Sequence, residues 1–439
     1  MDNIIPKYYK EYGLYTNKRK MLPNIIDGLL PVQRRILLTA HTIAKQKFVK
    51  TAKILGECMS RWHPHSTALG TAEWAVQNGF LDGDGQWGST IGEERLSCAA
   101  PRYTSVRANK EVEELAFEYV NFVEWKPDEA DPEPVAIPTM MPFCLMARRE
   151  ITSIAFGFKT EIPCYKFTDL IKRMLYLQGK INKVLIKPNI TGCKILSTPI
   201  ECESLLTTGE GKIYIHGRYK IDKIKKEVTI LGWSPRTIFR TLFDKIDKYK
   251  KWNLLSNRDI RYIDESSGDD GTKIVFEILK QRNKDQIFEK MIEAISESLK
   301  ASLSYHVVVV DGDNTKFSSV DEMLMRSYDY YKLAMTTFLQ HSIKKIGSDI
   351  DDLKVIKKIR PYISSVIKTK ETIEQLCENL SIKSKCSLES VKSVIEKYRI
   401  KRLLSVSLDI DELDKKVKVI QNTLDDIDNI CLEQYNSLA

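Results

Sequence analysis

The pair of residues best suited to covalent chemistry is Arg102-Tyr103, which follows a His-Pro-His triplet at 63–65 and a glycine-rich turn. A phenol has an unperturbed pKa near ~10, so it needs neighbouring cations to become a good nucleophile at neutral pH. Arg102 would also stabilise charge that gathers on a phosphorane-like transition state. Attack by Tyr103 on a phosphodiester would conserve the broken bond as a phosphotyrosyl link, which suits a reversible cut. Taken alone, the dipeptide is more simply a surface arginine beside a partly buried tyrosine.

Positive charge is concentrated ahead of this tyrosine. Residues 1–65 contain twelve Lys and Arg against four Asp and Glu, so they hold nearly all of the net charge of +9 of the 439-residue chain. A folded basic face attracts a polyanion through counterion release, which points to nucleic acid. The cations expected to assist Tyr103 and to hold phosphate are Lys20, Arg34 and Arg35.

Two histidines, His63 and His65, flank a proline upstream of the tyrosine. An imidazole there could hydrogen-bond a non-bridging phosphate oxygen or relay a proton. For either histidine alone, capping of a helix end is the simpler interpretation. The combination of basic segment, histidines, glycine turn and Arg102-Tyr103 is what favours DNA-phosphate binding.

Metal and nucleotide sites are not predicted in this chain. In-line displacement at phosphorus normally uses a divalent metal, yet the pairs Asp82-Gly-Asp84 and Asp311-Gly-Asp313 read more simply as turns than as ligands. The segment 209–212 lacks Walker A spacing. We therefore expect Mg²⁺ and ATP to be bound mainly by a partner subunit.

Composition indicates a soluble protein of the cytoplasm, or of the host cytoplasm if the chain is viral. Apolar residues make up 43% and charged residues 29%, without an apolar stretch long enough to span a bilayer. The N-terminus lacks the features of a secretory signal. Nine cysteines without Cys-x-x-Cys or zinc-type spacing indicate reduced thiols.

Local patterns around Tyr103 predict a helix-turn-helix followed by a wing. A helix is expected after Pro31, with Arg34 and Arg35 off its core face, because apolar residues then repeat at helical spacing. Further helices are expected over 51–61 and 66–78. Glycines 83, 85 and 88 then indicate a tight turn, or simply a surface loop.

The remainder of the chain predicts a mixed α/β region and then long helices. Strands are expected at 212–221, 227–233, 272–279 and 304–310, and a helix at 237–249. From a capping signature at 319–322, heptad spacing runs to Leu353, and a second run covers 413–427. These runs predict an antiparallel stalk with a small helical tip, although a plain helical bundle fits the same spacing.

These segments together resemble the DNA-breakage subunit of type IIA topoisomerases, a family that includes the cleavage subunits of gyrase and of topoisomerase IV. In length the chain is closest to the medium subunit of T-even-type phage topoisomerases. The match is ordered: residues 22–35 are similar to the N-terminal signature, 56–65 to the helix that leads into His-Pro-His, and 101–104 to the active site. Residues 82–89 are similar to the glycine turn ahead of the active site, and further matches follow in the same order at 137–139, 153–157, 208–215 and 307–312.

The resemblance implies an α/β (α+β) multidomain architecture. It places a winged-helix cleavage domain at 1–123, a tower at 124–318, and a long antiparallel coiled coil with a helical C-gate at 319–439. A homodimer joined at the C-gate would set two tyrosines opposite each other for a staggered break in double-stranded DNA. A second duplex would pass through, and the break would be religated. A separate ATPase/TOPRIM subunit would complete a heterotetramer-type assembly, without a membrane.

The resemblance also assigns roles to residues. Tyr103 would form a 5′-phosphotyrosyl link, with Arg102 as its transition-state partner. Ile154 would be the apolar wedge that intercalates and bends the duplex, an assignment that replaces the simpler expectation of a buried strand residue. The residues implied to hold the scissile and adjacent phosphates are Lys20, Arg34, Arg35, His63 and His65.

Some features depart from the family pattern. Lys20 stands where arginine is usual and Leu30 where lysine is common, so one or two phosphate contacts are weakened or lost. No DNA-wrapping β-propeller is expected after the second stalk helix, which predicts relaxation or decatenation rather than supercoiling. Two other functions stay open: a tyrosine recombinase, and a non-catalytic architectural coiled-coil dimer in which Tyr103 only packs.

Overall fold

A computed structural model describes the chain over residues 4–63, 68–89, 91–94, 96–127, 131–268, 271–280, 282–366, 372–398 and 400–438. The chain divides into two compact units. One is formed by residues 1–331 and 435–439, and the other by residues 332–434.

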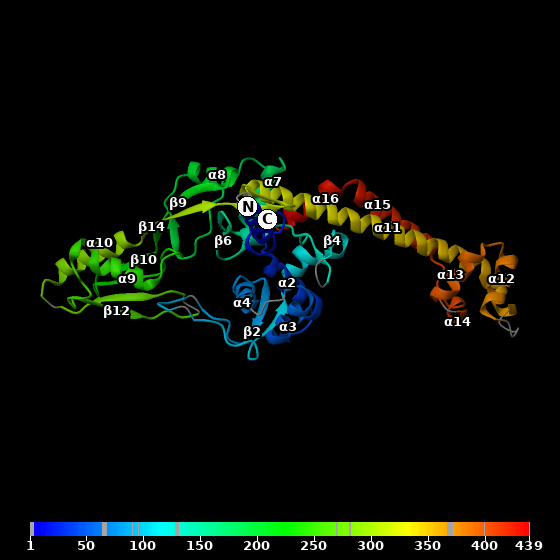
Figure 1. Cartoon of the computed structure of the whole chain (residues 1–439), viewed down its shortest axis with the longest axis horizontal. Helices are drawn as coiled ribbons and strands as arrows, with labels where there is room; N and C mark the ends of the chain where they lie inside the picture. Colours follow the sequence, from blue (N-terminus) through cyan, green and yellow to red (C-terminus); the bar gives the residue numbers. More distant parts are fainter. Residues whose placement is uncertain are drawn as a thin grey trace. The chain divides into compact units, whose positions relative to one another are not determined.

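The N-terminal part of the first unit combines helices with a small sheet (Figure 1). Its elements are α1 (Ile4–Thr16), α2 (Pro31–Ile43), β1 (Val49–Lys50), α3 (Thr51–Arg61), α4 (Leu69–Gln77), β2 (Leu81–Asp84), β3 (Ser105–Ala108) and α5 (Lys110–Val112). The strands form an antiparallel sheet in the order β1-β3-β2. The predicted helices that follow Pro31 and cover 51–61 are confirmed. The third predicted helix begins later than expected, at Leu69, and residues 66–67 lie outside the described part of the chain.

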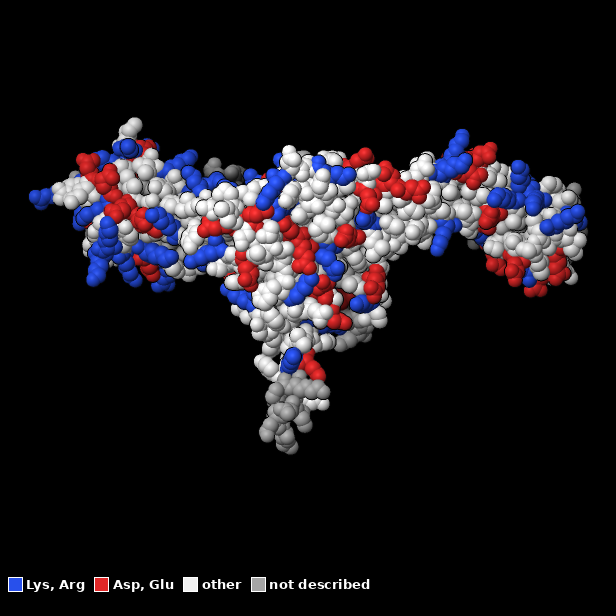
Figure 2. Space-filling view, turned by 90° about the horizontal axis from the view of Figure 1, so that it is seen from above, with Lys and Arg blue, Asp and Glu red and all other residues white. Residues whose placement is uncertain are grey.

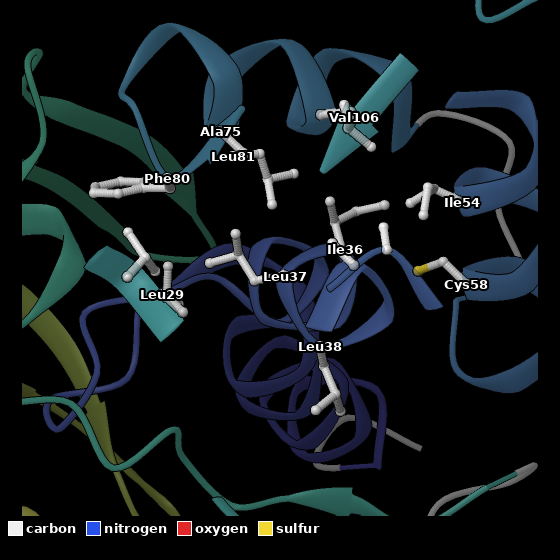
Figure 3. Packing of buried hydrophobic residues seen from close by; sticks show 14 of the residues in the cluster. Leu29, Ile36, Leu37, Leu38, Ile54, Cys58, Ala75, Phe80, Leu81 and Val106 are labelled. Carbon is white, nitrogen blue, oxygen red and sulfur yellow. The ribbon is translucent and has the colours of Figure 1, made fainter. Parts of the chain in front are cut away.

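The core of this part lies between α2, α3, α4 and the sheet. Ile36 of α2 is fully buried and points toward Val106 of β3 and Ile54 of α3 (Figure 3). Each fully buried aliphatic side chain stabilises the fold by about 1.5–3 kcal/mol relative to exposure. This packing fixes α3 and β3 relative to each other.

A connecting segment and a two-sheet region complete the first unit. The connection holds β4 (Trp125–Lys126), β5 (Glu133–Pro134) and α6 (Phe143–Met146). A sheet in the order β6-β7-β14-β9-β8 contains β6 (Ile151–Ala155), β7 (Phe158–Ile162), β14 (Lys300–His306), β9 (Glu210–Gly217) and β8 (Cys193–Ile195), accompanied by α7 (Phe167–Leu177) and α8 (Pro199–Thr208). A second sheet in the order β10-β11-β13-β12 contains β10 (Tyr219–Asp222), β11 (Glu227–Ile230), β13 (Ile274–Ile278) and β12 (Ile260–Asp264), and packs against α9 (Phe239–Lys248) and α10 (Lys284–Ser298). A separate hairpin pairs β15 (Val308–Asp311) with β16 (Asn314–Phe317).

Two of the strand predictions are wrong, because each predicted strand is divided into two in the structure. The strand expected over 212–221 ends at Gly217, and the one expected over 304–310 is interrupted at Val307. In both cases the chain leaves one sheet and enters another, from β9 to β10 and from β14 to β15. At the second break the Val307 amide donates to the carbonyl of Gly209 at 2.9 Å, outside the following ladder. The residue pattern does not show where each strand ends, because the end of each strand is set by partners that are distant in the sequence.

The second unit is helical, and it is entered through the long helix α11 (Val320–Val366). The predicted capping signature is confirmed, because the Glu322 amide donates to Ser319 Oγ at 3.0 Å. The other helices are α12 (Ile373–Ser384), α13 (Leu388–Tyr398), α14 (Ile400–Leu403), α15 (Ile410–Asp425) and α16 (Ile427–Ser437). The second heptad run, expected to be continuous through 413–427, is therefore divided between α15 and α16.

The returning helices run antiparallel to α11. Lys332 Nζ lies 2.8 Å from Asp428 Oδ1, near the start of α11. Near its end, Arg360 Nη2 donates to the carbonyl of Leu403 at 2.9 Å. Around this end an apolar cluster joins α11 to α12 and α13.

Thiol reactivity gives a first test of this core. Seven of the nine cysteines are buried, whereas Cys98 and Cys386 are half-buried. Burial raises the pKa of Cys58, Cys193 and Cys431 to about 11, which leaves little thiolate near neutral pH. We expect Ellman's reagent to modify at most the two half-buried thiols quickly in the native protein, and all nine after denaturation. Rapid modification of more than two native thiols would contradict this packing.

Candidate active site

Tyr103 lies in the turn that leads into β3, and its side chain is 64% exposed. The guanidinium carbon of Arg102 is 4.6 Å from the centre of the Tyr103 ring, a cation-π distance. The phenol is thus open to an incoming group, with a fixed positive charge over its ring. This arrangement suits attack on an anionic substrate.

The turn that carries Tyr103 is fastened to the beginning of α3. The amides of Thr51 and Ala52 donate to the carbonyls of Thr104 and Pro101, at 3.1 and 3.2 Å. The first amides of a helix have no partner within it, so these carbonyls satisfy groups that would otherwise need water. Thr104 Oγ also donates to Thr51 Oγ at 2.8 Å, and both residues are fully buried. The backbone around the nucleophile is therefore held rigidly.

The glycine turn predicted upstream contacts the same segment. Gly85 has a φ of +97°, and a Cβ at this position would lie 3.1 Å from the carbonyl oxygen of Tyr103. Beyond the turn, the Glu93 amide donates to Asp264 Oδ2 at 2.8 Å, and Tyr262 donates its hydroxyl to Glu93 Oε1 at 2.8 Å. The loop that leads to Tyr103 is thus braced by strand β12.

Arg34 and Arg35 are placed differently from the prediction. Both are only 6% exposed, so the expectation that they lie off the core face is wrong. The guanidinium of Arg34 binds Asp27 through contacts of 2.6 and 3.0 Å, and that of Arg35 binds Glu133 at 2.8 and 2.9 Å. Burial alone would lower the pKa of Arg34, but the charge and hydrogen bonds of Asp27 outweigh it and raise this pKa. A carboxylate beside each guanidinium is what makes its burial tolerable.

These two arginines still border solvent. A cavity of about 110 Å³ lies beside them, and Glu133 contributes to its wall. The cations that line this cavity are Lys18, Arg19, Arg34, Arg35 and Lys126. The cavity is therefore basic, although the carboxylates of Asp27 and Glu133 offset part of its charge.

The other predicted phosphate ligands have separate positions. Lys20 is exposed in the π-helical turn Asn17–Met21. His63 is half-buried directly after α3, where its amide donates to the carbonyl of Cys58 at 2.9 Å. His65 lies outside the described residues. Of the five predicted phosphate ligands, Lys20 is thus exposed and His63 half-buried.

Ile154 is presented on the hairpin β6–β7 and is 74% exposed, so the simpler expectation of a buried strand residue does not hold. The hairpin is held by Asn17, whose side-chain amide donates to the Phe156 carbonyl at 2.9 Å and accepts from the Phe156 amide at 2.8 Å. Ser153 Oγ adds a bond of 2.6 Å to the carbonyl of Met21. A large apolar side chain is therefore held out on a fixed hairpin, where it is available for contact with another molecule.

Two positioning residues were not found from the sequence, namely Thr51 and Asn17. Their partners lie 53 and 139 residues away, so no periodicity or short motif marks them. Among the described residues, no group of three or more His, Cys, Asp or Glu side chains is arranged to hold a metal ion. Within the same part of the chain, no helix is long and apolar enough to cross a bilayer.

A family model for the A subunit of DNA gyrase/topoisomerase IV matches residues 20–438. The chain belongs to this family. The resemblance drawn from the motifs is thereby confirmed. Within the family, the chain is 25% identical to the DNA topoisomerase 4 A subunit of Neisseria gonorrhoeae, over 82% of this chain and 52% of that protein. It is 24% identical to the DNA topoisomerase 4 A subunit of Streptococcus pneumoniae, over 95% of this chain and 53% of the relative.

A gyrase protein shows a similar level of likeness. The DNA gyrase A subunit of Helicobacter pylori is 24% identical, over 98% of this chain and 53% of the relative. The chain thus spans about half the length of the curated relatives it matches. Family membership is shown for nearly the whole chain, and the α+β architecture agrees with it.

Proposed function

We propose that this chain is the DNA-cleaving subunit of an ATP-dependent type IIA DNA topoisomerase. The observation that carries the proposal is the exposed Tyr103 beside Arg102, on a turn fastened to the first residues of α3, in a member of the gyrase/topoisomerase IV family. In the proposed step the Tyr103 oxygen attacks phosphorus and the bond to the 3′ oxygen breaks. The phenol proton is matched by the proton gained at the 3′ hydroxyl, and the 5′ phosphate stays on the protein. Because bond energy is conserved, the reverse attack religates the strand.

Arg102 is assigned to the transition state. A guanidinium is always charged and offers donors in a planar fork that matches phosphate geometry. The guanidinium carbon of Arg102 lies 4.6 Å from the centre of the Tyr103 ring, next to the group that would attack the phosphate. Lys20, Arg34, Arg35, His63 and His65 are assigned to the phosphates around it, with the carboxylate partners of Arg34 and Arg35 limiting their contribution.

The rest of the chain is assigned to holding and parting the duplex. We assign 1–123 to a winged-helix cleavage domain, 124–318 to a tower, and 319–439 to a coiled coil that ends in a C-gate. The antiparallel contacts of α11 with the returning helices support the coiled coil. A homodimer through the C-gate would bring two tyrosines to opposite strands for passage of a second duplex, giving relaxation or decatenation.

Mg²⁺ and ATP are assigned to a separate ATPase/TOPRIM subunit. Phosphoryl transfer of this kind normally uses divalent metal, but the acidic side chains of the described residues do not form a fitting cluster. When bound, Mg²⁺ would neutralise charge on the phosphate. The part of this chain is to supply the nucleophile and the fixed cations.

Identification of the attached residue tests the proposal. Complexes trapped with denaturant during incubation with duplex DNA, Mg²⁺ and the partner subunit should yield, after digestion, one peptide that carries a 5′-linked nucleotide on Tyr103. Attachment to another residue, or through a 3′ phosphate as in a tyrosine recombinase, would exclude the proposed step. Duplex binding without any adduct would favour the architectural alternative.

Ile154 gives a second, independent prediction. If Ile154 inserts between base pairs, Ile154→Ala should reduce the bending of a doubly labelled duplex and lower cleavage about tenfold. The effect on affinity should be smaller, because the variant no longer unstacks base pairs but keeps all of its charged contacts. Fluorescence energy transfer between the duplex ends measures the bend. Ile224→Ala is the matched control, since Ile224 is 96% exposed on the turn between β10 and β11. Unaltered bending in the Ile154 variant would remove the wedge from the proposal.

A further inference from the structure

The connection between α2 and α3 carries a strip of exposed cations. No Asp or Glu occurs between Asp27 and Glu57, whereas Lys or Arg stands at positions 34, 35, 45, 47, 50 and 53. Figure 2 shows acidic and basic side chains interspersed over the face that it draws. The run of basic residues without an acidic one between Asp27 and Glu57 differs from this mixed distribution. In the interval 45–53 the exposed lysines are Lys45, Lys47, Lys50 and Lys53.

Among the described residues, no carboxylate is paired with three of these lysines. Lys45 Nζ lies 3.1 Å from Glu113 Oε2, so its charge is partly offset. Lys47, Lys50 and Lys53 form no ion pair within the part of the chain that the structure describes. We call these three residues the lysine strip.

Backbone contacts place the lysine strip beside the Tyr103 turn. Lys50 of β1 pairs in register with Ser105 of β3, two residues beyond Tyr103. The next residues, Thr51 and Ala52, donate their amides to the turn itself. Lys53 follows in the first turn of α3, and its side chain is exposed. The strip and the nucleophile therefore belong to one hydrogen-bonded substructure.

An aromatic residue between the lysines contacts a side chain of strand β3. Phe48 is 43% exposed, and the guanidinium carbon of Arg107 lies 4.8 Å from the centre of its ring. Arg107 is itself paired with Asp82 at 2.7 Å, so it is held on the sheet. Phe48, the neighbour of Lys47, is thus in contact with a residue of strand β3.

We propose that the lysine strip binds backbone phosphates of the duplex next to the one attacked by Tyr103. The inference rests on the proposed function and deepens it by naming contacts outside the family signature. An ammonium on a flexible stem binds phosphate as a point charge, and each neutralised phosphate releases condensed counterions. The contact is independent of base sequence, which suits an enzyme that must hold a broken strand at many sites.

Salt dependence of binding tests the proposal directly. With the full chain and a short labelled duplex, fluorescence anisotropy at increasing KCl gives the slope of log K against log salt. Each phosphate contact contributes about 0.9 to this slope, so replacing all three lysines by glutamine should reduce its magnitude by about 2.7. The variant with three arginines should keep the slope of the natural chain, since the charge is retained.

A matched variant controls for the loss of net charge. Lys415, Lys416 and Lys418 are exposed on α15, and their replacement by glutamine removes the same charge. This variant should keep the original slope. An unchanged slope in the lysine-strip variant, or an equal fall in both triple variants, would overturn the proposal and indicate that the strip faces another acidic partner or only solvent.

The measurement separates this inference from the proposed function. Tyr103→Phe should leave the salt slope intact, whereas the glutamine variant of the strip should form adducts again when the salt concentration is lowered. If the slope falls as expected but the natural chain forms no adduct with its partner subunit, the strip is a DNA contact and only the assigned chemistry fails.

Discussion

Tyr103→Phe is expected to abolish covalent protein–DNA adducts while duplex affinity stays unchanged. The substitution removes one hydroxyl group and keeps the ring that Arg102 covers at 4.6 Å. Because the ring is largely exposed, the packing of the turn does not depend on the hydroxyl. Loss of a covalent nucleophile lowers a rate by about 10⁴-fold or more. The measurement is the yield of labelled DNA retained on denatured protein, with Mg²⁺ and the ATPase partner present.

Tyr214→Phe is the matched control for this experiment. Tyr214 is 44% exposed, and Lys212 Nζ lies 5.3 Å from the centre of its ring, so it too is an exposed tyrosine under a cation. Its variant should form adducts at the level of the natural chain. Adducts at natural yield in Tyr103→Phe, or equal loss in both variants, would remove Tyr103 from its assigned role.

Helices near the candidate site could be predicted because their signals are local. Pro31 fixes the first φ of α2, and the apolar residues that follow repeat at the helical period. The same holds for α3, which spans 51–61 as expected. For these two helices the sequence predicts where each helix lies in the chain. It does not predict which faces of α2 are buried, because Arg34 and Arg35 also lie in the interior.

Strands were harder to predict because their ends are decided by other strands. Residues 304–310 end in four consecutive valines and read as one strand, but the first part pairs with β9 and the last part with β16. The interruption at Val307 is set by the amide's bond to Gly209, about a hundred residues earlier in the chain. Such a partner exists only in the folded chain, so the strand-forming residue types alone overestimated the length of the strand.

Charged residues at the candidate site show the same limit. The helical spacing of the apolar residues after Pro31 predicted Arg34 and Arg35 off the core face, where arginines normally lie. Burial became possible because Asp27 and Glu133 lie opposite their guanidinium groups. Ile154 departs in the other direction: an isoleucine within a strand pattern is exposed at the end of a hairpin. The exposure of Ile154 agrees with the role that the family resemblance implies and not with the burial that its residue type predicts.

Asp27→Ala is expected to reduce the free energy of unfolding of the first unit by about 3–5 kcal/mol. Asp27 is fully buried and accepts two hydrogen bonds from Arg34, at 2.6 and 3.0 Å. It also accepts from the amides of Leu29 and Ile137, at 3.0 Å each. Removal leaves a buried guanidinium without its counter-charge and two amides without their acceptor. Urea unfolding followed by tryptophan fluorescence measures the loss, and the exposed Asp414→Ala in α15 is the control.

A double-mutant cycle assigns this loss to the ion pair. Arg34→Met alone should also destabilise the unit, because it strands the carboxylate of Asp27. The double variant, Asp27→Ala with Arg34→Met, buries no unpaired charge. Its loss in free energy of unfolding should therefore be about 1–3 kcal/mol smaller than the sum of the losses in the two single variants. Simple additivity would mean that the two side chains act separately and that the amides of Leu29 and Ile137 account for the effect. A coupled result would mean that Arg34 is held mainly by Asp27, so the phosphate contact that we propose for it would have to be made through the cavity that it borders.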